Sequence, residues 1–121
     1  MAAVFAYPKS SRLLNSADFS RVFKRAELNI SRGPLRLRAI QNRMPRARLG
    51  VVVSKRGNAK AVRRNRIKRL IRERFRLNQP QLPGVDMAIQ VFAPVEDRVL
   101  VAQIDQLFNQ VKERFEHDHH R

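Results

Sequence analysis

Three stretches of the chain repeat apolar side chains at helical spacing. Phe19, Val22 and Phe23 share one face of a short helix expected over residues 16–25. A longer helix is expected over residues 61–77, and an amphipathic C-terminal helix is expected from about residue 100 to 115. The buried stripe of the middle helix falls at i, i+3, i+4 and i+8, and it consists of Ile67, Leu70, Ile71 and Phe75.

Three other stretches have the patterns of strands. Residues 35–40 alternate apolar and basic, which predicts a half-buried strand with Arg36 and Arg38 on its open face. Residues 49–53 are almost continuously apolar, which suits a central strand, and residues 86–92 predict a further strand. Gly33-Pro34 and Pro83-Gly84 interrupt the chain between these elements.

The predicted order is helix, two or three strands, basic helix, strand, helix. A long helix between two apolar strands favours a βαβ unit within a small two-layer α/β (α+β) sandwich. The 121 residues are expected to form one domain, residues 1–121, with flexible ends at about 1–11 and 117–121.

Charge separates one part of the chain from the rest. The formal net charge is +16 at pH 7, from 26 Lys and Arg against 10 Asp and Glu. Residues 48–76 hold twelve basic side chains and only Glu73 as an acidic one, whereas residues 77–121 carry more acid than base. A basic surplus concentrated in this way predicts a polyanionic partner.

Few residues suggest chemistry by the protein itself. There is no cysteine, every histidine lies in the last five residues, and the aspartates are scattered, so we expect neither a catalytic residue nor a metal site. No apolar stretch is long enough to span a membrane, and residues 1–10 lack the pattern of a secretory signal. A cytoplasmic location, with no membrane partner and no obligate protein partner, is therefore expected.

The middle helix also carries a polar stripe opposite its apolar one, formed by Asn65, Lys68, Arg69, Arg72 and Arg76. A solvated helix face usually mixes charges at i, i+4, but Glu73 is the only carboxylate in this helix, so the side chains are not expected to neutralise one another. Docking on an anionic membrane fits less well, because the apolar stripe is needed for the core and the chain has no Trp. The stripe indicates binding to nucleic-acid phosphates.

The run Arg64-Asn65-Arg66-Ile67-Lys68-Arg69-Leu70-Ile71-Arg72-Glu73 resembles the RNR motif of the ribonuclease P protein family. The preceding run from Arg48 to Arg56 resembles the strand and Ser-Lys-basic turn of that family, and Asp18-Phe19 with Val22-Phe23 resembles its N-terminal helix. The resemblance covers about residues 12–115.

The resemblance implies a small mixed sheet with a left-handed βαβ crossover, and a protein subunit that assists a catalytic RNA. In the family that RNA performs the Mg²⁺-dependent removal of the 5′ leader from precursor tRNA, and the Mg²⁺ is bound mainly through the RNA. The resemblance assigns contact with ribonuclease P RNA to Lys55, Arg56, Lys60, Arg63, Arg64, Asn65, Arg66, Lys68, Arg69, Arg72 and Arg76. It assigns the aromatic wall of a cleft for the leader to Phe19 and Phe23. We expect Arg12, Arg36 and Arg38 at the same cleft, although some relatives have an aromatic on the strand that carries Arg36 and Arg38.

Several alternatives remain at this point. Phe19 and Phe23 could be simple core, and the arginines on the strand of residues 35–40 indicate leader contact by charge more than by stacking. A structural RNA-binding protein of the ribosomal type would share the basic surface without a role in cleavage. A duplex DNA binder would place the basic helix in a major groove.

Overall fold

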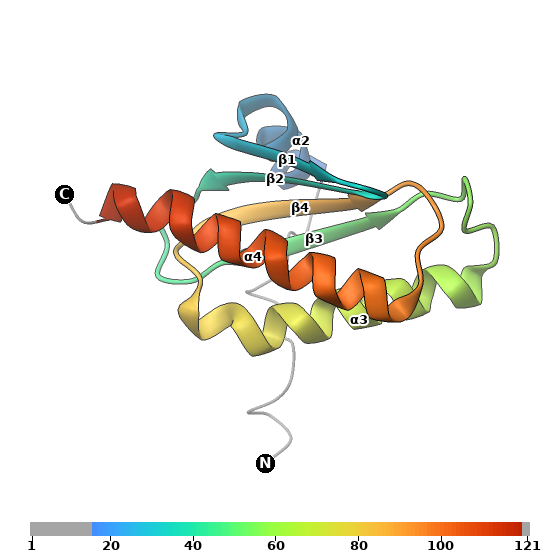
Figure 1. Ribbon diagram of the computed structural model, residues 1–121. Helices are drawn as coiled ribbons and strands as arrows, with labels where there is room; N and C mark the ends of the chain where they lie inside the picture. The colour runs from blue at the N-terminus through green and yellow to red at the C-terminus, as the bar shows by residue number, and fades with distance from the viewer. Residues whose placement is uncertain (1–15, 120–121) are drawn as a thin grey trace, which may run out of the picture.

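The structure, a computed structural model, describes residues 16–119. Three α-helices, four strands and one short 3₁₀ helix make up this part of the chain (Figure 1). In chain order they are α2 (Ser16–Arg25), β1 (Leu28–Arg32), β2 (Leu35–Gln41), β3 (Arg48–Val53), α3 (Ala61–Asn78), η2 (Gln79–Gln81), β4 (Val85–Val91) and α4 (Asp97–His119). The segment 1–11, which was expected to be flexible, lies outside the described residues. The other segment expected to be flexible, 117–121, begins within α4, which continues to His119.

The four strands form one mixed sheet in the order β1-β2-β4-β3. β1 pairs with β2 and β2 with β4 in antiparallel fashion, whereas β3 and β4 are parallel neighbours joined through α3. This confirms the predicted βαβ unit. In Figure 1, β3 and β4 run in the same direction with β4 above β3 and the layer of α3 and α4 toward the viewer, so the crossover is left-handed.

The prediction that residues 49–53 form a central strand was wrong. β3 is an edge strand, and Val52 on it is 41% exposed. β4 is one of the two interior strands, and Gln90 is its only residue that is not fully buried. Asp86 and Gln90 within β4 concealed its position, because a strand buried on both faces usually reads as continuously apolar.

Each face of the sheet is covered differently. α3 and α4 pack together over one face, where Ile67, Ile71 and Phe75 from α3 join the inward side chains of all four strands in the main core. The ring of Phe75 meets Phe108 of α4 edge-on, with 6.1 Å between centroids. α2 lies on the opposite face over β2 and β4, where only a small apolar cluster forms (Figure 1).

None of the helices in residues 16–119 is both long enough and apolar enough to cross a membrane.

Candidate nucleic-acid interface

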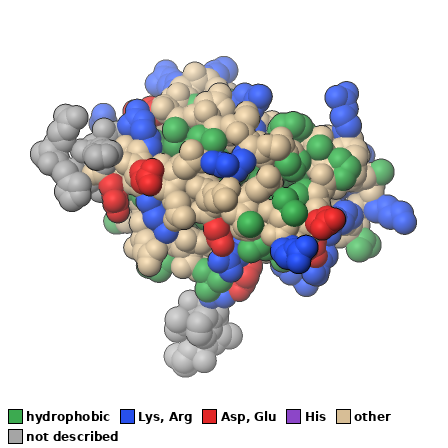
Figure 2. Space-filling model, in the orientation of Figure 1, with side chains coloured by type: hydrophobic (Ala, Val, Ile, Leu, Met, Phe, Trp, Pro, Cys, Tyr) green, Lys and Arg blue, Asp and Glu red, His purple; other side chains and the backbone are tan. Residues whose placement is uncertain are grey.

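The side of α3 that faces α4 has its arginines neutralised. Asp97, at the start of α4, pairs with Arg63 and Arg66 at 2.7 Å each, and Asp105 pairs with Arg74 at 2.8 Å. The hydrogen bonds from Arg63 and then Arg66 hold the pKa of Asp97 below its usual value. On the molecular face seen in Figure 2, acidic and basic side chains are accordingly interspersed.

The side of α3 that faces away from α4 is different. Lys68, Arg69 and Arg72 have no ion-pair partner among the residues that the structure describes, and Asn65 beside them is exposed. Helical spacing places these four residues, the basic stripe from here on, along one strip of surface. The expectation that the side chains of this helix would not neutralise one another left out carboxylates from other elements, and Asp97 and Asp105 of α4 pair with arginines on the side opposite the basic stripe.

Arg76 does not belong to the basic stripe as expected, since it forms an ion pair with Glu73 one turn before it. The hydrogen bond from Arg76 lowers the pKa of Glu73. Arg63 and Arg66, which the RNR resemblance assigned to RNA contact, are engaged with Asp97 in the protein alone. The sequence could not reveal this, because Asp97 is 31 residues from Arg66.

The loop between β3 and α3 extends the basic surface. Lys55, Arg56 and Lys60 are all exposed on it. The loop is held in place by buried Asn58, whose side chain donates to the carbonyl oxygen of Ala93 at 3.2 Å. The Arg64 guanidinium also donates to the carbonyl oxygens of Asn58 and Ala59 in this loop, at 3.0 and 2.6 Å. Gly57 lies against Pro94.

A second candidate surface lies on the face of the sheet that carries α2. Phe19 and Phe23 of α2 are half-buried, their ring centroids are 6.0 Å apart, and both pack against the small cluster of Val22 and Ala88. The guanidinium of Arg38 lies 5.1 Å from the centroid of Phe23. Arg36 is the next residue on the same face of β2 and is half-buried beside Ser31.

Sequence reasoning missed three residues of this face, namely Val52, Gln90 and Phe92. Val52, Gln90 and Arg36 lie in one row across the sheet, since Val52 pairs in register with Gln90 and Gln90 with Arg36. Phe92 follows on the same side by strand alternation and is 41% exposed. The alternation of Asp86, Ala88 and Gln90 was the available signal. We call the surface formed by Phe19, Phe23, Arg36, Arg38, Val52, Gln90 and Phe92 the sheet cleft, after the leader cleft that the family resemblance implies here.

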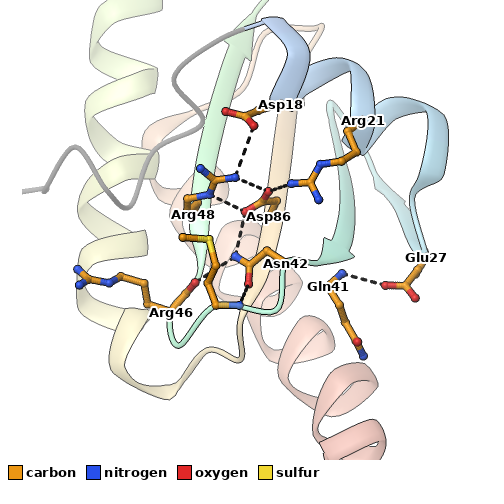
Figure 3. A network of polar contacts seen from close by, with 9 residues as sticks. Asp18, Arg21, Glu27, Gln41, Asn42, Arg46, Arg48 and Asp86 are labelled. Atoms are coloured by element: carbon orange, nitrogen blue, oxygen red, sulfur yellow. Dashed lines mark hydrogen bonds and ion pairs between the residues drawn. The ribbon is translucent and has the colours of Figure 1, made fainter.

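At the other end of this face, Asp86 is completely buried and surrounded by donors (Figure 3). Arg48 gives it two hydrogen bonds of 2.8 Å, Asn42 gives one of 2.9 Å, and Arg21 of α2 forms an ion pair with it. Burial alone would raise the pKa of Asp86, but the hydrogen bonds from Arg48 and Asn42 and the two positive charges lower it overall. The hydrogen bonds to Asp86, with the negative charges of Asp86 and Asp18, raise the pKa of Arg48.

Within residues 16–119, no group of three or more His, Cys, Asp or Glu side chains could hold a metal ion. Both oxygens of Asp86 are already occupied by arginine and asparagine donors. Arg12, which was expected in the leader cleft, lies outside the described residues.

Comparison with known proteins gives one consistent result. The family model Ribonuclease P matches residues 7–117. A ribonuclease P protein component from Marinobacter nauticus is 38% identical over 112 residues, covering 90% of this chain and 84% of the relative. Another from Halorhodospira halophila is 36% identical over 119 residues, covering 97% and 93%.

Solved structures agree. The RNase P protein of Staphylococcus aureus superposes with a TM-score of 0.71 at 28% identity, covering 87% of this chain and 94% of that one. The RNase P protein of Thermotoga maritima gives 0.67 at 31% identity, covering 84% and 96%.

Proposed function

Since the chain belongs to the ribonuclease P protein family and so has a role in tRNA processing as part of a ribonuclease complex, we propose that it works there by binding two RNAs at two surfaces. The basic stripe and the loop of residues 54–60 bind the catalytic RNA subunit. The sheet cleft binds the single-stranded 5′ leader of precursor tRNA. The protein thereby assists removal of the leader, which yields the mature 5′ end.

The uncompensated charge of the basic stripe is the observation that carries this proposal. Lys68, Arg69 and Arg72 project from a helix whose opposite face is fixed in the core, and among the described residues no carboxylate neutralises them. A guanidinium can bind two phosphate oxygens at once, and each neutralised phosphate releases counterions. Arginines 63, 66 and 74 contribute less, because they already have carboxylate partners.

The sheet cleft suits a single strand of variable sequence. Half-buried Phe19 and Phe23 offer ring faces on which bases can stack, and stacking contributes about 1–3 kcal/mol per base whatever the base is. Arg36 and Arg38 supply positive charge for the backbone of the same strand. The cleft therefore combines the two features that binding without sequence preference requires.

Chemistry by the protein has no support in these residues. The described chain offers no cluster of ligands for Mg²⁺, so we propose that the RNA subunit binds the Mg²⁺ that hydrolysis needs and carries out the cleavage. The contribution of the protein is then to hold the two RNAs and to reduce the repulsion between their phosphates. A cofactor bound by the protein itself is not part of this proposal.

Reconstitution with the RNA subunit tests the function directly. Cleavage of precursor tRNA is measured at low Mg²⁺ with and without the protein, where we expect cleavage only with it. An Arg69→Ala/Arg72→Ala double variant should need a much higher protein concentration for the same rate. Failure of the intact protein to restore cleavage would favour a purely structural RNA-binding role instead.

A duplex DNA binder would behave differently in a second assay. Binding to the RNA subunit is measured in the presence of random duplex DNA, which should compete only weakly. Strong competition by duplex DNA would contradict the proposal.

A further inference from the structure

Helix α2 is attached to the sheet through few apolar side chains. Val22 is the only residue of α2 that is fully buried, and it packs on Ala88 with Ile40 and the two half-buried phenylalanines around it. The opposite layer of helices shares the main core with all four strands. Something besides apolar contact must therefore fix how α2 sits on the sheet.

Two ion pairs supply this attachment, and both involve the Asp86 network (Figure 3). Arg21 of α2 pairs with Asp86, and Asp18 of α2 lies 3.5 Å from Arg48, which itself binds Asp86. Asp86 is inaccessible to solvent, and Arg48 and Asn42 hold its position from β3 and from the loop after β2. The carboxylate is thus a fixed point to which α2 is tied.

The two flanks of α2 have separate roles. By helical spacing, Asp18 and Arg21 lie on one side of Val22, and Phe19 and Phe23 lie on the other. A helix held at one flank transmits that placement to its opposite flank, because the helix backbone is rigid over ten residues. The phenylalanines form one wall of the sheet cleft, so the position of that wall depends on the pairing at the other flank.

We propose that Asp86 and Arg21 are positioning residues that set where Phe19 and Phe23 lie over the sheet, and thereby the affinity for the leader, without touching it. The proposal rests on the proposed function, since it concerns the same cleft. It assigns a role to a buried carboxylate that neither RNA contact nor catalysis explains.

Replacing Arg21 by Met is the first test, because Arg48 and Asn42 still satisfy Asp86 in that variant. The measured quantity is the ratio of affinities of the reconstituted holoenzyme for precursor tRNA with a leader and for mature tRNA. We expect this ratio to fall about fivefold, which is the lower end of what one base stack contributes. Arg21→Lys should recover part of the ratio, since it keeps a positive donor near Asp86.

Arg25→Met is the matched control. It removes the same charge from the same helix at an exposed position, and Arg25 has no ion-pair partner in the described part of the chain. We expect it to leave the ratio within about twofold, because an exposed single charge contributes little. An equal fall in both variants would mean that charge on α2, not its placement, is what matters, and would overturn the proposal.

The position of α2 relative to α4 is the second measured quantity. The sequence has no cysteine, so Lys24→Cys in α2 and Gln106→Cys in α4 would carry two spin labels at exposed sites. The distance distribution between the labels should broaden with Arg21→Met and remain narrow with Arg25→Met. A fall in the ratio without broadening would show that Arg21 contacts the leader directly, which would also overturn the proposal.

Phe19→Ala separates this inference from the function on which it rests. If Phe19→Ala lowers the ratio and Arg21→Met does not, the cleft binds the leader but is not positioned by Asp86. If Phe19→Ala leaves the ratio unchanged, the cleft itself is misassigned.

Discussion

At the scale of single residues, the arginines of α3 differ in whether a carboxylate already holds them. Arg69 and Arg74 stand five positions apart on one helix and carry the same charge, but Arg74 makes two hydrogen bonds to Asp105. Among the described residues Arg69 has no such partner. Because an arginine that must leave a carboxylate gains less from a phosphate, location in the same motif does not imply equal contribution to binding.

Arg69→Ala and Arg74→Ala therefore give a matched pair. We expect Arg69→Ala to reduce the slope of log K against log salt for RNA-subunit binding by about one unit, as expected for one lost phosphate contact. Arg74→Ala should change the slope by much less. The slope is measured by titrating the RNA at several salt concentrations, and equal changes in the two variants would contradict the division of α3 into two sides.

The charge of Asp86 leads to a prediction about how the stability of the fold depends on pH. Its pKa in the folded protein is lowered, so it stabilises the fold above the unfolded value of about 3.9, and this contribution disappears as the pH falls through the folded pKa. Asp86→Asn should cost about 3 kcal/mol at pH 7, because Arg48 and Arg21 lose their charged partner. Urea unfolding at pH 7, 5, 4 and 3 measures this.

The free-energy difference between the wild-type protein and Asp86→Asn should shrink only below about pH 4. A difference that stays constant down to pH 3 would show that packing, not the charge of Asp86, explains the loss of stability.

At the scale of elements, the spacing of apolar residues was sufficient to predict all three helices and three of the four strands, and only α4 begins and ends three or more residues beyond its expected bounds. α2 was expected over residues 16–25 and is found there, and β2 extends one residue beyond its expected end. β1 was left open because Leu28–Arg32 reads Leu-Asn-Ile-Ser-Arg, which has too little apolar contrast to stand out. Its pairing with β2, a contact between chain segments, makes it a strand.

The candidate site was predictable where it depends on one helix and not where it depends on neighbours. The row of Lys68, Arg69 and Arg72 follows from spacing alone. The pairing of Arg63 and Arg66 with Asp97, and of Asp86 with Arg21, joins residues more than 30 positions apart. The sequence does not show which carboxylate a given arginine will meet after folding.

The loop between β3 and α3 permits a prediction at this scale. Gly57 has φ of +79°, and a Cβ there would come within 2.5 Å of the Pro94 ring. Gly57→Ala should displace the loop that carries Lys55 and Arg56, and so weaken binding to the RNA subunit by several-fold. Affinity and Tm are measured together.

Gly33→Ala is the control for Gly57→Ala. Gly33 lies in the turn between β1 and β2 and also has a positive φ, +57°. A Cβ there would meet only the end of the Gln103 side chain. Backbone strain of about 1 kcal/mol or more is common to both variants, so both should lower Tm. Only Gly57→Ala should weaken RNA binding, and a similar loss of affinity in Gly33→Ala would mean that the effect is one of stability.

At the scale of the whole molecule, the protein keeps its two layers together in spite of strong self-repulsion. The net charge is +16, and α4 supplies the carboxylates that neutralise one side of α3. The side left unneutralised lies next to edge strand β3, at the margin of the sheet. Charge that opposes folding is thus concentrated where a polyanion can compensate it.

A multivalent anion that binds the basic stripe should therefore stabilise the folded protein. Pyrophosphate at ten times its dissociation constant would contribute about 1.4 kcal/mol, because it binds the folded chain and not the unfolded one. That gain should raise Tm by roughly 5 °C. The rise should increase with the logarithm of pyrophosphate concentration above its dissociation constant. It should be smaller in Arg69→Ala/Arg72→Ala than in Arg74→Ala. A rise of equal size in both variants would show that the anion binds elsewhere on the molecule and that the basic stripe does not contribute to this stabilisation.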